Sequence, residues 1–149
     1  MMRIPMVLLV SALLASCAGT HLVQPDGFAS YGSPCFASDH KAVSPEGVTW
    51  HIHVEKKQPA ADLSFWKIAL RKRMAEAGYR ITDSLDFQSA GQLGYALELT
   101  APLGGADYYY LVAAVPNQGR ILVAEASGAA EAYLKRRPAI LAALLHVAE

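Results

Sequence analysis

Two histidines, spaced two residues apart, offer the most specific chemistry in this sequence. His51 and His53 belong to the run 48–55, in which apolar and polar residues alternate without a break. Such alternation is typical of a β-strand, whose successive side chains point to opposite faces. The two imidazoles would lie on one face about 6.5–7 Å apart, a spacing that can present both to one Zn or Cu ion. The alternative interpretation is the solvated polar face of an edge strand. Further ligands could come from the same face or from the preceding segment: Glu55, Asp39, His40 and His21.

Three consecutive tyrosines form a second candidate surface. Tyr108, Tyr109 and Tyr110 begin the strongly β-prone run 108–115, so their rings point to both faces of a strand. At least one ring would face away from the helices, where aromatic side chains can stack on sugars, bind acyl chains or contact a partner protein. The alternative is ordinary cross-strand packing, because tyrosine is a good strand former.

Local catalytic motifs are absent from the sequence. It contains no Gly-x-Ser-x-Gly, His-Glu-x-x-His, Cys-x-x-Cys or Gly-x-x-x-x-Gly-Lys segment. We therefore predict a non-enzymatic protein. An envelope hydrolase remains an alternative, since catalytic residues can be brought together from distant positions.

The N-terminus carries the pattern of a secretory signal peptide. Residues 1–16 combine a positive charge at Arg3, an apolar run and a small-residue exit, and the run is too short to cross a bilayer permanently. The segment Leu14-Ala15-Ser16-Cys17 resembles the lipobox of bacterial lipoproteins at all four positions. That resemblance implies cleavage before Cys17, a diacylglycerol on its sulfur and, in Gram-negative bacteria, a third acyl chain on its amino group. An uncleaved anchor or an ordinary signal peptide is the alternative.

The lipobox resemblance also implies a location. Ala18 follows the cysteine where lipoproteins kept in the inner membrane typically carry Asp, so the expected site is the periplasmic side of the outer membrane. A Gram-positive host would place the protein on the outer face of its cell membrane. Two or three acyl chains hold a protein on a membrane stably. Cys35 is then left without an intramolecular partner, and could pair between chains.

Composition restricts the class of partner. The chain balances 13 Lys and Arg against 13 Asp and Glu, and removal of Arg3 with the signal peptide leaves 12 against 13. No basic field is present to concentrate nucleic acid, so we expect no nucleic-acid partner. The partners expected are membrane lipid, through Cys17, and an envelope protein. The only cofactor expected is the covalent lipid, with Zn or Cu at His51 and His53 as the alternative.

The remaining chain predicts one α+β domain. Residues 17–47 are rich in Gly, Pro and Ser, and we interpret them as the lipidated cysteine and a flexible tether before a domain at 48–149. Within the domain, the patterns predict five strands and two helices: 48–55, 79–87, 95–100, 108–115 and 120–126, with helices at 63–77 and 129–147. Short connections favour a mostly antiparallel five-stranded sheet. Each helix is apolar on one side, which predicts that both pack on one face of the sheet, in two layers.

This order of elements resembles the small α/β domains of the PsbP, Mog1 and DcrB type. The resemblance covers 48–147: a strand, a helix ending at Gly78-Tyr79, a meander, and the segment 123–128 leading into a closing helix. Those families are mostly binding or assembly factors. The resemblance therefore implies a non-enzymatic accessory or binding module of the cell envelope. The alternative function is a small-ligand or metal-binding domain that uses the face of His51 and His53.

Overall fold

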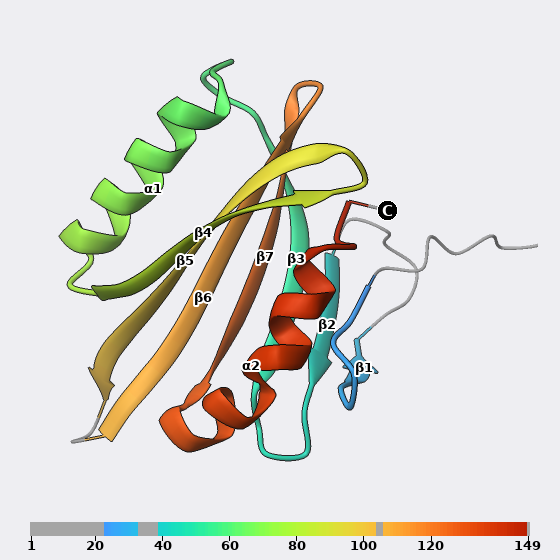
Figure 1. Cartoon of the computed structure of the whole chain (residues 1–149), viewed down its shortest axis with the longest axis vertical. Coiled ribbons are helices and arrows are strands. Elements are labelled where there is room, and N and C mark those ends of the chain that lie inside the picture. Colours follow the sequence, from blue (N-terminus) through green and yellow to red (C-terminus); the bar gives the residue numbers. More distant parts are fainter. Residues whose placement is uncertain (1–22, 33–38, 104–105, 149) are drawn as a thin grey trace, which may run out of the picture.

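A single seven-stranded antiparallel sheet forms the centre of the protein (Figure 1). The computed structural model describes residues 23–32, 39–103 and 106–148, so the lipobox, Cys17 and Cys35 lie outside the described residues. The sheet order is β1-β2-β3-β7-β6-β5-β4. The elements are β1 Ala29–Tyr31, β2 Asp39–Val43, β3 Thr49–Lys56, α1 Leu63–Glu76, β4 Arg80–Ser89, β5 Gln92–Leu103, β6 Ala106–Asn117, β7 Arg120–Ala129 and α2 Ala130–Leu144.

The prediction of five strands is wrong, although the α+β class holds. The two additional strands, β1 and β2, lie within the stretch that we interpreted as a tether. Gly27 and Gly47 adopt positive φ angles of 79° and 85°, as expected in turns. Strands as short as β1 and β2, separated by such turns, have too few residues to show an alternating pattern in the sequence. The Ser44 amide closes the turn between β2 and β3 by donating a hydrogen bond to the Val48 carbonyl, with an N to O distance of 2.8 Å. Together, β1, β2 and β3 form one meander, and β4 to β7 form a second.

The two helices lie on opposite faces of the sheet, and not on one face as predicted (Figure 1). Helix α1 contacts β4, β5 and β6, whereas α2 contacts β6 and β7. Tyr133, Ile140 and Leu144 of α2 are buried in the larger core, which includes Trp50. Leu70 and Met74 of α1 pack against a smaller core on the other face. The molecule therefore has three layers.

The sequence of the central strands explains this three-layer arrangement. On β5 and β6, Leu97 and Val112 are buried under α1, while the neighbouring Ala96 and Leu111 are buried under α2. A strand that is apolar on both faces exposes one apolar surface unless each face is covered. The run Leu111–Val115 is buried at every position. It does not alternate, and two-sided cover is the arrangement that such a run requires.

The ends of helix α1 follow the expected signals. Asp62 accepts a hydrogen bond from the Phe65 amide at 3.0 Å, and Gly78 adopts a φ of 86° directly after the helix. Pro138 lies inside α2, which nevertheless continues to Leu144. Within the part of the chain that the structure describes, neither helix has the length and apolar character needed to cross a bilayer.

A buried ion pair ties α2 to the sheet. Glu98 of β5 is only 6% exposed, and its carboxylate accepts hydrogen bonds from Arg137 at 2.7–3.0 Å and from the Tyr133 hydroxyl at 2.9 Å. Burial, and then the neighbouring Glu98 carboxylate, raise the pKa of Tyr133 well above its ordinary range. Because both carboxylate oxygens are bonded, the charge of Glu98 is compensated, and its loss of solvation is offset only while Arg137 is present.

Replacement of Arg137 should therefore destabilise the fold. Arg137→Met leaves the buried Glu98 carboxylate unpaired, and we expect the free energy of unfolding to fall by about 3 kcal/mol in urea denaturation. The matched control is Lys72→Met, which breaks the exposed pair between Lys72 and Glu76 and should cost about 0.5 kcal/mol or less. Equal effects of the two substitutions would contradict the account of Glu98.

Candidate functional site

The pairing of β3 with β7 creates the candidate site. In this antiparallel pair, His51 lies directly opposite Glu125, and His53 lies opposite Val123. These side chains share the face that carries α1, because Val123 packs into the core beneath that helix. Helix α1 lies mainly over β4, β5 and β6, and the histidines of β3 and Glu125 of β7 remain partly exposed. We call His51, His53 and Glu125 the imidazole–carboxylate cluster.

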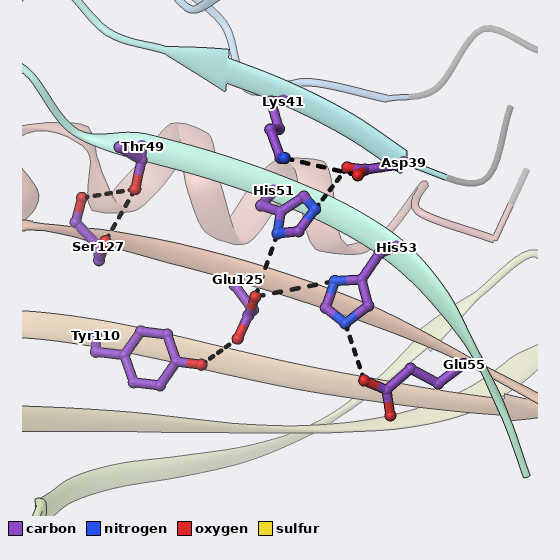
Figure 2. A network of polar contacts seen from close by, with 9 residues as sticks. All are labelled: Asp39, Lys41, Thr49, His51, His53, Glu55, Tyr110, Glu125 and Ser127. Atoms are coloured by element: carbon purple, nitrogen blue, oxygen red, sulfur yellow. Dashed lines mark hydrogen bonds and ion pairs between the residues drawn. The ribbon is translucent and has the colours of Figure 1, made fainter. Parts of the chain in front are cut away.

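Both imidazoles face the same oxygen atom of Glu125 (Figure 2). Glu125 Oε2 lies 3.4 Å from His51 Nδ1 and 3.9 Å from His53 Nδ1. One potential ligand atom from each of the three residues lies within 4.8 Å of the others. The side chains are 29%, 23% and 29% exposed for His51, His53 and Glu125, so the cluster is partly shielded from water yet accessible. The two imidazole rings stack, with centroids 4.6 Å apart.

Each member of the cluster also contacts a polar group outside the cluster (Figure 2). Asp39 Oδ1 lies 2.6 Å from His51 Nε2, and Glu55 Oε1 lies 3.3 Å from His53 Nε2. The Tyr110 hydroxyl donates to Glu125 Oε1, the oxygen that faces away from the histidines. Metal-binding histidines typically donate their distal N–H to a carboxylate or carbonyl in this way, which fixes the ring orientation.

The electrostatics of the outer groups follow from these contacts. The hydrogen bond with His51 holds the pKa of Asp39 below its ordinary value. Burial, and then the hydrogen bond to Glu125, raise the pKa of Tyr110 well above its ordinary range, while Arg73 acts in the opposite direction. Tyr110 therefore stays protonated and remains a donor to Glu125.

The donor set fits a first-row transition metal ion. Two imidazole nitrogens and one carboxylate oxygen suit Zn²⁺, Cu²⁺ or Fe²⁺, whereas Mg²⁺ and Ca²⁺ prefer oxygen ligands alone. Tetrahedral zinc with bonds of about 2.0–2.2 Å places neighbouring ligand atoms about 3.3 Å apart. The observed 3.4 Å matches this separation, and the 3.9 Å distance needs a closure of about half an ångström.

A cleft adjoins the cluster between α1 and the sheet. Its volume is about 300 Å³, and both His53 and Glu125 line it. The remaining wall is mainly apolar, with one cation, Arg73, from the last turn of α1. We call this space the α1 cleft. Its larger apolar lining residues are Trp66, Leu70, Met74, Val112, Ile121 and Val123, and Ala69 and Ala114 also line it.

The predicted tyrosines are divided between the two faces. Tyr110 lines the α1 cleft and contacts the ring of Tyr79 at 5.5 Å between centroids. Tyr109 lies on the other face, stacked on Tyr133 of α2 at 5.2 Å. Tyr108 is half-buried near the beginning of β6. The structure therefore brings only Tyr110 to the histidines.

Of the additional ligands suggested by the sequence, only some approach the cluster. Asp39 and Glu55 contact the histidines directly. His40 lies opposite Ile52, whose side chain belongs to the core under α2, so His40 occupies the other face. Burial lowers the pKa of His40. His21 lies outside the described residues.

Sequence reasoning missed Glu125, the third member of the cluster. Glu125 is the one charged residue in the otherwise apolar run 121–126, and this isolated charge was an available signal. Its proximity to His51 depends on the pairing of β3 with β7, strands separated by more than sixty residues. Arg73 is one of four cations on α1, and only the structure places it in the cleft wall.

Comparison with solved structures identifies the fold. No family model matches the chain, and no curated protein matches it in sequence. The solution structure of cyanobacterial PsbP (CyanoP) from Synechocystis sp. PCC 6803 superposes with a TM-score of 0.58 at 13% identity, covering 81% of each chain. The fold is PsbP-like. PA94 from Pseudomonas aeruginosa, a protein of unknown function, matches with a TM-score of 0.58 at 12% identity, covering 79% of this chain and 94% of that one.

Both likenesses concern the fold alone, because identities of 12% and 13% are too low to transfer a function. The resemblance to PsbP domains inferred from element order is confirmed at this level.

The contact between Asp39 and His51 makes a prediction about pH. His51→Ala removes the hydrogen bond that lowers the pKa of Asp39, so the carboxyl should titrate at higher pH in the variant than in the wild type, as followed by NMR. The stability that this bond contributes is present above the unfolded-state pKa of Asp39 and is lost as the pH falls through the lower folded-state pKa. An unchanged titration midpoint would show that the bond does not form.

Proposed function

We propose that this protein is a lipid-anchored, non-enzymatic accessory module of the bacterial envelope that binds a divalent transition metal ion. The imidazole–carboxylate cluster carries the proposal. Zn²⁺ or Cu²⁺ would be held by Nδ1 of His51, Nδ1 of His53 and Oε2 of Glu125. This choice favours the metal-binding alternative of the sequence analysis over a purely protein-binding module.

The direction of the imidazole nitrogens supports a metal ion. Each Nε2 faces the carboxylate of Asp39 or Glu55, and is therefore best assigned as the protonated nitrogen. In a neutral imidazole, Nδ1 then carries a lone pair, and both Nδ1 atoms face the same oxygen of Glu125. Three lone-pair atoms facing one another repel unless a cation lies between them.

Protonation of the two Nδ1 atoms is the alternative to a bound metal ion. Two additional protons would produce two imidazolium rings stacked 4.6 Å apart, and these like charges repel. Moreover, His53 Nδ1 is buried and has no hydrogen-bond partner among the described residues, which is costly for a polar atom. One divalent ion would replace both protons and be bound by all three atoms. It would avoid the repulsion between two imidazolium rings and give His53 Nδ1 a partner.

The envelope location rests on the lipobox resemblance at 14–17 and the signal-peptide pattern before it. A protein anchored through Cys17 on the periplasmic side of the outer membrane would present its metal to other envelope components. The PsbP-like fold supports an accessory role, and the absence of local catalytic motifs supports binding without catalysis.

Metal binding is tested on the detergent-solubilised full chain. We expect one equivalent of zinc per chain, measured by equilibrium dialysis with elemental analysis. His53→Ala and Glu125→Ala should each weaken zinc binding at least tenfold, because each removes one of three protein ligands. The control is His146→Ala, which alters an exposed histidine that follows α2, away from the cluster.

Two results would contradict the metal proposal. The first is an absence of stoichiometric zinc, copper or cobalt on the wild type. The second is equal weakening by His146→Ala and His53→Ala, which would point to diffuse surface binding. Either result would leave the cluster as a network of protonated histidines and carboxylates.

The anchor is tested separately by intact mass and membrane fractionation. The native protein should begin at Cys17, carry the mass of two or three acyl chains and fractionate with outer membranes. Cys17→Ser should abolish the lipid mass and the membrane association. An unmodified native chain would refute the anchoring part of the proposal without affecting the zinc measurement.

A further inference from the structure

We infer that the α1 cleft binds a small carboxylate with an apolar chain, whose carboxylate completes the coordination of the metal ion. This inference rests on the proposed metal site and names its ligand.

Three protein ligands leave the metal with open positions. Zinc is at least four-coordinate, and three-ligand sites typically hold water or a substrate in the fourth position. Two members of the cluster, His53 and Glu125, line the α1 cleft. The donors of the cluster all come from β3 and β7, in the floor of the cleft, so the open side faces α1.

Arg73 supplies the charge that selects an anion. Of the cations on α1, Lys67 pairs with Asp86, Arg71 donates to the Tyr95 hydroxyl and Lys72 pairs with Glu76. Arg73 has no carboxylate partner among the described residues. It lines the same cleft as Tyr110 and Glu125, and the Tyr110 hydroxyl donates to Glu125. A carboxylate bound between the metal and Arg73 would gain a charge-assisted hydrogen bond.

Glu55, the other carboxylate in the cleft wall, is already engaged, because its Oε1 lies 3.3 Å from His53 Nε2. Arg73 is the one cation among the residues that line the cleft, so the anionic group of a ligand would lie between the metal and Arg73.

The remaining lining favours an apolar chain. Trp66 precedes Arg73 by seven residues, or about 10.5 Å along the helix axis. Leu70 and Met74 of the helix and the sheet residues Val112 and Val123 form the walls. A volume of about 300 Å³ is at the lower end of small-molecule sites, so the chain must be short. Hexanoate has the required charge, length and apolar character.

The test measures hexanoate and acetate on the cobalt-loaded full chain in detergent. Both ligands should change the visible absorption of the bound Co²⁺, and hexanoate should bind at least tenfold more tightly than acetate. Hexanol, which lacks the carboxylate, should leave the cobalt spectrum unchanged. Arg73→Gln should weaken hexanoate at least tenfold, whereas Lys72→Gln should not.

A second variant tests the position of the apolar chain. Ala69 lines the cleft from α1, and Ala69→Phe would fill part of the space. Hexanoate should then weaken at least tenfold, while acetate binding stays within twofold. Because the same variant is measured with both ligands, a misfolded protein is recognised by the loss of both.

The outcomes separate this inference from the metal proposal. If zinc and cobalt bind but hexanoate binds no more tightly than acetate, or does not depend on Arg73, the ligand inference is overturned and the metal site stands. If hexanoate binds equally well without metal, coordination of its carboxylate is refuted. If no metal binds, both proposals fail together, and the dialysis measurement shows this independently.

Discussion

The antiparallel pairing of β3 with β7 is the interaction on which the rest of the structure depends. It joins the meander β1–β3 to the meander β4–β7 and completes one sheet from two separate segments of the chain. The same register places Trp50 opposite Ala126 in the core under α2, and His51 opposite Glu125 on the other face. A slip of one residue would exchange the two faces, burying the imidazoles and exposing the core. Core packing therefore fixes the geometry of the polar cluster.

The two faces of the β3–β7 pair differ in how completely a helix covers them. Under α2, small alanines on β7 let Trp50 and Tyr133 fill the space between helix and sheet. On the opposite face, α1 covers β4 to β6 but not β3, so polar residues on β3 remain partly solvated. The incomplete cover leaves the α1 cleft beside the cluster. This cleft exists because one helix spans only part of its sheet.

The sequence predicted what depends on local pattern. The alternation of apolar and polar residues predicted β3 and the common face of His51 and His53. Asp62 and Gly78 indicated the two ends of α1. The strand count was wrong because β1 and β2 are short and interrupted by Gly and Pro, and their stability comes from pairing with β3. The prediction that both helices pack on one face was wrong. The run Leu111–Val115 is buried at every position, which requires cover on both faces of the strand. Glu125 was missed because its partner lies on a strand distant in the sequence, a contact that no local pattern encodes.

The central claim is that one metal ion is held by the two Nδ1 atoms that face Glu125. Long-range ¹H–¹⁵N NMR of the imidazoles, recorded on the full chain before and after one equivalent of zinc, tests it most directly. We predict that Nδ1 of both His51 and His53 moves to the chemical shift of a metal-bound nitrogen, while both Nε2 atoms stay protonated and bonded to Asp39 and Glu55. Coordination through Nε2, or Nδ1 atoms that remain protonated at saturating zinc, would contradict the account.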